Sequence, residues 1–255
     1  MRKVLVSLCF VALTIALPAS AQLAPKSLNR VIVVKPKASM SAQWEAGLKK
    51  LNDWAKQHNL LLANQCWEII SGPRTGQYVI ASPGHDWKDF DAAAKASQGV
   101  RAQILADVDP YTKSHLTSVW EYLEKLSSPP ENTSQTPPAF IEVTTYFLKP
   151  GGGPAVTDAI REANAAIQKS HWPGKPSSWW TLVNGGNGPQ MALVSGRENW
   201  AEFQPPETSF FKMLNEVYGQ EGASALGKKF FSGLRSWRSE IWRSRPDLSY
   251  IPASQ

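Results

Sequence analysis

Two matching segments, Trp87-Lys88-Asp89-Phe90 and Trp200-Ala201-Glu202-Phe203, lie 113 residues apart and indicate that the sequence consists of two similar halves. An internal repeat of this kind defines the architecture before single elements are assigned. Asp86 and Asn199 directly precede the two segments, and their side-chain oxygens are suited to capping the first turn of a helix. We therefore expect a helical region to begin at each segment, and the leading tryptophan of each segment to belong to the core.

Each half begins with a predicted strand and a predicted helix. The β-branched run at residues 31–34 is followed by Lys-Pro, as is the run at residues 141–148, and such residues favour strands. Apolar or small residues then recur in steps of four, three and four, which marks one face of a helix. The two series are Trp44, Leu48, Leu51 and Ala55 in the first half, and Val156, Ile160, Ala163 and Ile167 in the second.

The remaining strands follow in the same order in both halves. Two short strands around a glycine-containing turn are predicted at residues 65–70 and 77–81, and again at residues 179–183 and 191–194. A last strand, at residues 116–123 and 234–242, follows the second helical region. The resulting order, β-α-β-β-α-β, is that of a ferredoxin-like sandwich.

A linker is predicted between the halves. Residues 128–138 contain four prolines and no large apolar side chain, which is typical of an extended segment. It separates two ferredoxin-like repeats, residues 28–127 and 139–250. The helices of each repeat cover one face of its sheet, and the other face needs an apolar partner, which the second repeat can supply. The predicted fold class is therefore α+β, with two tandem repeats packed against each other.

The N-terminus has the features of a signal peptide. Met1-Arg2-Lys3 precedes an apolar run at residues 4–17, and small residues then indicate cleavage after Ala21. The apolar run is shorter than the ~20 residues of a spanning helix, so no stable membrane insertion is expected. Cleavage would leave Cys66 as the one cysteine of a secreted or periplasmic protein, where a buried, unreactive role is expected.

Charge and motifs exclude several classes of protein. The formal charge of +6 is mild, and no basic stripe alternates with stacking aromatic residues, so nucleic-acid binding is not expected. The sequence contains none of the short motifs of serine hydrolases, thiol-redox proteins, zinc proteases or P-loop nucleotide binders. Scattered carboxylates show no spacing that indicates an acid–base pair.

With the two Trp-x-x-Phe segments, the Lys-Pro that closes each first strand and the C-terminal residues 245–250, the sequence resembles the dimeric α/β-barrel superfamily. Within it, the sequence resembles NIPSNAP-like and antibiotic-biosynthesis-monooxygenase-like bacterial proteins. The resemblance implies an intramolecular barrel built from both halves, with a cleft between the helices and the sheet of each half. Members include cofactor-independent monooxygenases, haem-degrading and chlorite-dismutase-like haem proteins, and stress-responsive binding proteins, so the fold does not select one activity.

Two histidines are the candidate catalytic residues. His58 and His171 follow the first helix of each half, where an imidazole could act as a general base, a proton shuttle or a haem ligand. The alternative, which we favour, is a local role, because a histidine at a helix C-terminus interacts favourably with the exposed carbonyls.

Aromatic residues form the candidate ligand site. Eleven tryptophans are present, and an aromatic-lined cavity is suited to a planar apolar ligand, with a tyrosine as its hydrogen-bonding end. The candidates are Trp67, Tyr78, Tyr146, His171, Trp179 and Trp180.

The sequence leaves three functions open. The first is an exported module that binds a small aromatic or apolar molecule, with no metal or cofactor. The second is a cofactor-independent monooxygenase, in which His58 or His171 removes a proton from the substrate. The third is haem binding through one of these histidines. Whether the protein is an enzyme, and whether it oligomerises further, the sequence does not decide.

Overall fold

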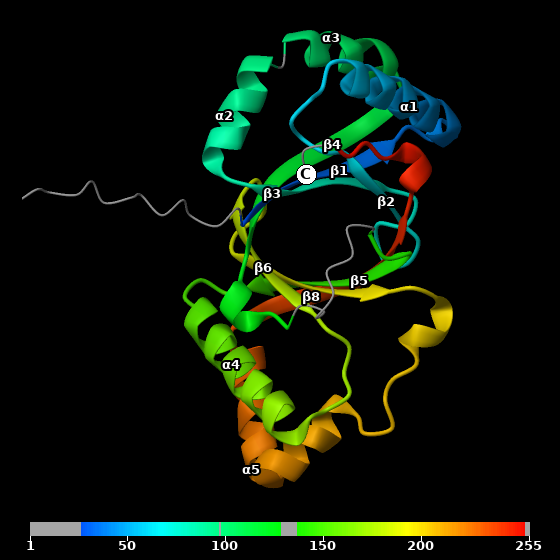
Figure 1. Cartoon of the computed structure of the whole chain (residues 1–255). Helices are drawn as coiled ribbons and strands as arrows, with labels where there is room; N and C mark the ends of the chain where they lie inside the picture. The colour runs from blue at the N-terminus through cyan, green and yellow to red at the C-terminus, as the bar shows by residue number, and fades with distance from the viewer. Residues whose placement is uncertain (1–26, 97, 129–136, 253–255) are drawn as a thin grey trace, which may run out of the picture.

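Eight antiparallel strands form a closed barrel in the computed structural model, with helices on two opposite sides (Figure 1). The structure describes residues 27–96, 98–128 and 137–252. The predicted signal peptide and most of the predicted linker lie outside the described residues. The strand order around the barrel is β1-β3-β2-β8-β5-β7-β6-β4, so each half of the chain contributes four neighbouring strands.

The predicted strands and first helices are confirmed, with ends shifted by a few residues. The first half contains β1 (Leu28–Pro36), α1 (Ser41–Gln57), β2 (Gln65–Ile69), β3 (Tyr78–His85), α2 (Trp87–Ala96), α3 (Gln98–Asp107) and β4 (Thr112–Tyr122). The second half contains β5 (Phe140–Leu148), α4 (Gly153–Ser170), β6 (Ser178–Asn184), β7 (Gln190–Arg197), α5 (Phe210–Ser232) and β8 (Leu234–Ser244). Short 3-10 helices are η1 (Asp109–Tyr111), η2 (Glu124–Leu126), η3 (Trp200–Phe203) and η4 (Pro246–Leu248).

The second helical region differs between the halves. The first Trp-x-x-Phe segment opens α2, whereas the second forms only η3, because two prolines at residues 205–206 prevent a continuous helix. Both predicted caps are confirmed. Asp86 Oδ1 accepts a hydrogen bond from the Asp89 backbone N–H at 3.0 Å, and Asn199 Oδ1 accepts one from the Glu202 N–H at 3.3 Å.

The expectation that both leading tryptophans belong to the core is wrong. Trp87 is 54% exposed and Trp200 is 58% exposed. Each follows the end of a strand at the surface. Trp87 packs against Phe90 with 5.8 Å between ring centroids, and Trp200 packs against Phe203 at 5.3 Å and Phe140 at 4.9 Å. The Trp-x-x-Phe pattern therefore marks the start of a helical turn rather than a core contact.

Trp87→Ala and Trp200→Ala should each lower the free energy of unfolding by less than about 1 kcal/mol, because substitutions at exposed positions cost little. Urea denaturation of the two variants measures this. A loss of several kcal/mol in either variant would mean that its indole is buried in solution.

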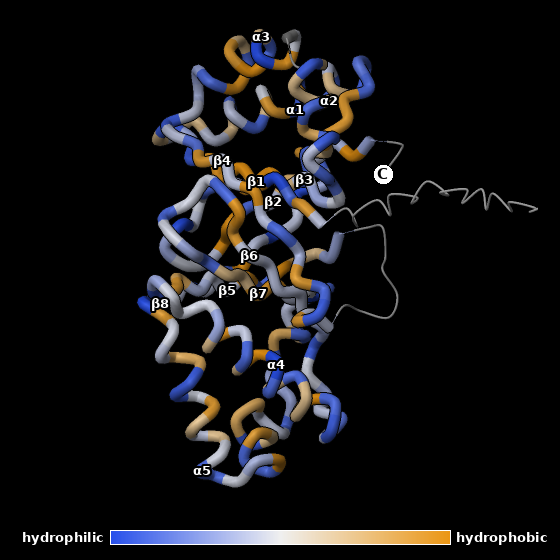
Figure 2. Tube along the Cα trace, turned by 90° about the vertical axis from the view of Figure 1, so that its left-hand side faces the viewer, coloured by the Kyte–Doolittle hydropathy of each residue, from blue (hydrophilic) through white to orange (hydrophobic). Residues whose placement is uncertain are grey.

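The apolar core has three parts, one inside the barrel and one on the outer face of the strands in each half. Inside the barrel, Trp67, Ile69 and Val79 of the first half pack with Ile141 and Trp242 of the second. On the outside, α1 buries its predicted apolar face against the first four strands, and α4 does the same against the other four. Figure 2 shows the strands in the middle, with the helices of the two halves at opposite ends of the molecule. Each half thus has a helix–sheet core of its own, and the two halves share the interior of the barrel.

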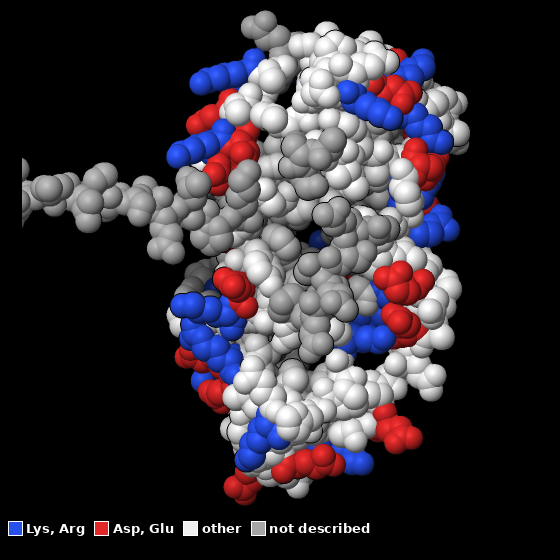
Figure 3. All heavy atoms as spheres, viewed as in Figure 1, with Lys and Arg blue, Asp and Glu red and all other residues white. Residues whose placement is uncertain are grey.

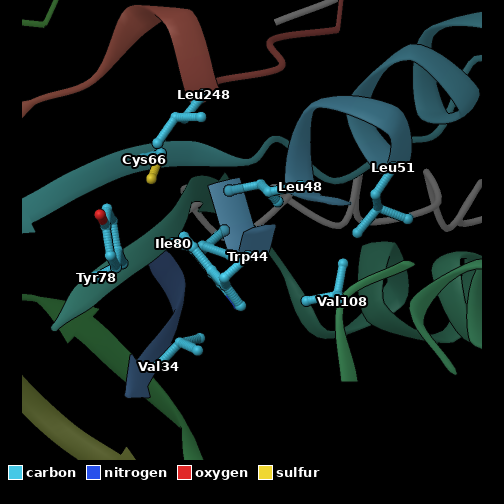
Figure 4. Packing of buried hydrophobic residues seen from close by; sticks show 9 residues of the cluster. All are labelled: Val34, Trp44, Leu48, Leu51, Cys66, Tyr78, Ile80, Val108 and Leu248. Carbon is cyan, nitrogen blue, oxygen red and sulfur yellow. The ribbon is translucent and has the colours of Figure 1, made fainter. Parts of the chain in front are cut away.

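The segments that follow the last strand of each half are exchanged. After β4, η2 packs on the second half, where the Asn164 side-chain amide donates to the carbonyl of buried Leu126 at 2.9 Å. After β8, η4 packs on the first half, where the Asn52 amide donates to the Leu248 carbonyl at 2.8 Å. Figure 4 shows Leu248 within the first-half core, next to Cys66. Each helix–sheet core is therefore completed by the other half.

A matching pair of serines fixes the exchanged segments, residues 124–127 and 246–250. Ser127 Oγ accepts a hydrogen bond from the Trp179 backbone N–H at 2.8 Å. Ser249 Oγ accepts one from the Cys66 N–H at 2.9 Å. Both exchanges thus use an asparagine on the first helix and a serine in the segment.

Cys66 is buried, and burial raises the pKa of its thiol, which keeps it protonated and unreactive at neutral pH, as expected. Within the described ranges no helix is long and apolar enough to cross a bilayer. Basic and acidic side chains are interspersed over the face drawn in Figure 3.

Candidate functional site

Each half encloses a cavity between its helices and its sheet. The cavity in the first half, which we call the first cleft, has a volume of about 490 Å³. The cavity in the second half, the second cleft, has a volume of about 880 Å³. Both volumes lie in the range of about 300–1,000 Å³ that is usual for small-molecule sites.

Aromatic rings form much of the wall of the second cleft. Tyr146 on β5 stacks on Trp179 of β6 with 5.6 Å between ring centroids, and Phe230 of α5 meets the Tyr146 ring edge-on at 5.2 Å. Beyond α4, Trp172 and Phe210 pack edge-on at 5.6 Å. A planar apolar molecule would find stacking and edge contacts here.

Exposed aromatic residues border the same cleft. Phe211, Phe231 and Trp237 line it although they are about half exposed, and the last two rings are 5.7 Å apart. Large exposed apolar groups that gather at one place mark a contact surface. They place an apolar entrance between α5 and β8.

Polar groups of the second cleft lie on its sheet side. Arg197 Nη2 is 3.1 Å from Glu142 Oε2, and its Nη1 donates to Ser195 Oγ at 2.6 Å. Burial, together with the charge of Glu142, raises the pKa of Tyr146 to about 12, so this phenol is neutral at physiological pH. The cleft therefore offers a neutral hydroxyl and a paired charge beside its apolar walls.

Of the six candidate ligand residues, Tyr146 and Trp179 line the second cleft. Trp180 follows Trp179 on β6, so its side chain points to the other face of the sheet, where it packs on Tyr122 at 5.2 Å. Trp67 likewise lies inside the barrel.

Tyr78 lies in the first-half core, where its hydroxyl donates to Glu45 Oε1 at 2.5 Å. It is buried and lines neither cleft. The structure therefore does not bring Tyr78 together with Tyr146 and Trp179.

Neither candidate histidine lines a cleft. His58 ends α1, where its ring stacks at 3.9 Å on Trp54 and its Nδ1 lies 2.8 Å from the Trp54 carbonyl oxygen. His171 ends α4 in a left-handed conformation, with φ 49°, and its side chain is exposed. The His58 ring thus contacts a carbonyl at the end of its helix and His171 occupies the corresponding helix end, and the local role of both residues stays a prediction.

Two polar residues of the first cleft were not found from the sequence. Arg30 lies on β1 and His115 on β4, and both line the cleft among apolar side chains. The signal was present in the alternation of β1, because Arg30 shares a strand face with Ile32 and Val34.

The donor set of the second cleft does not fit a haem. Its described lining contains no histidine, cysteine or methionine, and its tyrosine is held neutral, although haem iron takes such an axial ligand. Across the described ranges no cluster of three or more metal-binding side chains occurs.

No protein-family model matches the sequence, and no curated protein matches it. Solved structures do match the fold. An anthrone oxidase-like protein is similar with a TM-score of 0.56 at 12% identity, over 86% of this chain and 92% of the other. A provisionally named monooxygenase from Lactobacillus acidophilus NCFM has a TM-score of 0.52 at 6% identity, over 89% and 97%. A mutant chlorite dismutase from Candidatus Nitrospira defluvii has a TM-score of 0.51 at 8% identity, over 87% and 92%. The fold of this chain is thus similar to the α/β barrel of these solved structures.

Proposed function

We propose that this protein binds a small aromatic or apolar molecule in the second cleft. The observation that carries the proposal is the cavity of about 880 Å³ whose wall is built from the stacked Tyr146 and Trp179 rings and from Phe230. Aromatic packing of this kind usually fills a core, yet here the rings face open volume. The neutral Tyr146 hydroxyl supplies a hydrogen bond that would orient a ligand carrying one polar group.

A neutral aromatic probe, N-phenyl-1-naphthylamine, tests this proposal by fluorescence titration. Ala163 lines the second cleft from α4, so Ala163→Trp should fill part of it and weaken probe binding at least tenfold. Ala93→Trp adds the same side chain to the first cleft and is the matched control, with an expected change below about twofold.

Thermal melts must show that both variants fold. Unchanged probe affinity in Ala163→Trp, or a loss confined to Ala93→Trp, would contradict binding in the second cleft.

The monooxygenase function stays a second candidate, supported by the names of two structural neighbours. It requires a base that faces the substrate, and His58 and His171 lie outside both clefts. In the second cleft the carboxylate is Glu142, which is already paired with Arg197. Oxygen uptake with candidate aromatic substrates would favour this function over binding alone.

Three further statements belong to the proposal. The first is export, which rests on residues 1–21, and N-terminal sequencing of the mature protein should then begin at Gln22. The second is duplication of an ancestral unit, supported by the repeated Trp-x-x-Phe segments and by the matching exchanged segments. The third is a relation to NIPSNAP-like proteins, which rests on the sequence patterns alone.

A further inference from the structure

The first cleft contains a positive charge for which the protein supplies no partner. Arg30 projects from β1 into this cleft, and its nearest polar contact is Asn64 Oδ1, at 3.5 Å from Nη2. Its Nε is buried and makes no hydrogen bond. Among the described residues no carboxylate forms an ion pair with it. An unpaired buried charge is costly, so a missing counter-charge calls for an explanation.

The second half shows how such a charge is usually matched. By strand register Arg30 and Glu142 are equivalent, because Arg30 pairs with Ser82 on β3 and Glu142 pairs with Ser195 on β7. Glu142 is neutralised by Arg197, two residues beyond Ser195. In the first half the register shifts by one residue here, so that Leu28, the equivalent of Phe140, pairs with His85, and Gly84 has no side chain. No described carboxylate stands in these positions, so Arg30 lacks an ion-pair partner where Glu142 has one.

A second unsatisfied donor borders the same cleft. The indole N–H of Trp44 on α1 is buried and has no hydrogen-bond partner. Figure 4 shows Trp44 next to Ile80 within the apolar cluster of the first half. Buried donors of this kind are nearly always satisfied, and the Arg30 Nε is the one at the cationic end of this cleft, where the acceptor atoms of a ligand would meet it.

Most of the remaining lining is apolar, and its other polar residues are Asn64, Asp109, Thr112, His115 and Thr117. The apolar part comes from β1, α1, α2 and α3, with residues such as Ile32, Leu48, Leu51, Phe90 and Ile104. The carboxylate of this cleft, Asp109, lies in η1, three residues before Thr112. Thr112 pairs with Pro36, which is six residues along β1 from Arg30, and six residues of a strand span about 20 Å. Asp109 therefore lies towards the opposite end of β1 from Arg30. The cavity thus combines an apolar body with one cationic end.

We propose that the first cleft binds a small apolar monocarboxylate, with its carboxylate on the Arg30 guanidinium and its hydrocarbon part along the apolar wall. A guanidinium binds a carboxylate through two parallel hydrogen bonds, which suits the free donors of Arg30. Burial lowers the pKa of Arg30 to about 10, so the guanidinium remains charged at neutral pH and is available to an anion. The protein then carries two chemically different sites, and this second site stands independently of the function proposed for the second cleft.

Calorimetry with decanoate and 1-decanol tests the proposal, because the two probes share a hydrocarbon chain and differ in charge. Arg30→Met should weaken decanoate binding at least tenfold and change decanol binding less than about twofold, since it removes the charge and keeps the apolar volume. Arg30→Lys should retain part of the affinity.

The cavity-filling variants locate the site. Ala93→Trp should abolish decanoate binding, and Ala163→Trp should leave it unchanged, which is the reverse of the result expected for the neutral aromatic probe. The proposal is overturned if Arg30→Met binds decanoate as the unmodified protein does, if both probes lose affinity equally, or if only Ala163→Trp blocks decanoate. Failure of the neutral probe at the second cleft would leave these results intact.

Discussion

Glu240→Ala should lower the free energy of unfolding by about 3–5 kcal/mol, the usual cost of removing one partner of a buried ion pair. Glu240 lies on β8 inside the barrel and is 2% exposed. Arg74 donates to both carboxylate oxygens, at 2.9 and 2.6 Å, and Arg238 Nε lies 3.2 Å from Oε1. The Trp242 indole N–H donates to Oε2 at 3.1 Å. Without the carboxylate, two guanidinium groups would share the barrel interior with no acid to pair with.

Urea denaturation at neutral pH measures this loss. Glu216→Ala, at an exposed position on α5, is the control and should change stability by no more than about 0.5 kcal/mol. A loss below 1 kcal/mol in Glu240→Ala would mean that water or rearranged side chains replace the carboxylate.

The same carboxylate should make stability depend on pH in the acid range. Burial alone raises the pKa of Glu240, but the hydrogen bonds and charge of Arg74, with the charge of Arg238, outweigh burial and hold the pKa below its ordinary value. A lowered folded-state pKa stabilises the protein above the unfolded value of about 4.3, and this contribution disappears as the pH falls through the folded-state pKa. The stability difference between the unmodified protein and Glu240→Gln should therefore shrink below about pH 4.

Leu248→Ala should cost about 2–5 kcal/mol, the range for a buried leucine whose loss leaves a cavity. Leu248 is fully buried against Trp44 and Leu48, although it belongs to the segment that follows β8. Because the barrel and the exchanged segments join the halves, the variant should still unfold in a single transition, at a lower urea concentration. Fluorescence and circular dichroism should report the same midpoint.

Ile251→Ala is the matched control, three residues further on and 45% exposed, with an expected change below about 0.5 kcal/mol. If Leu248→Ala instead produced two separate transitions, the halves would be energetically independent and the exchange would contribute little. Equal effects of the two substitutions would contradict the observed burial of Leu248.

The sequence predicted the strands and the first helices because their periodicities are strong and each first helix has a buried face. It failed where two faces look alike. Trp179 and Trp180 are adjacent on one strand, and one points into the cleft and the other into the barrel. Both faces of this sheet are apolar. Residue type therefore does not reveal which of two successive strand residues points into the cleft.

Charged residues of the clefts were missed for a related reason. Arg30 looks like an ordinary surface residue until the structure shows that Ile32 and Val34, on the same face of β1, line the first cleft with it. The histidines were noticeable by their scarcity, yet their contacts are local to the ends of α1 and α4. Matching positions in the two halves thus predicted the helices and strands better than they predicted which residues line the clefts.

The exchanged segments also set the order in which the chain can acquire its native structure during synthesis. Although all its strands and helices are translated first, the N-terminal half lacks the Leu248 contact of its core, beside Trp44 and Leu48, until Leu248 has left the ribosome. Until then the apolar surface that Leu248 contacts is exposed to solvent and to any chaperone or translocation factor that binds unfolded chains. The core of the first half is thereby completed only when synthesis of the chain is almost finished.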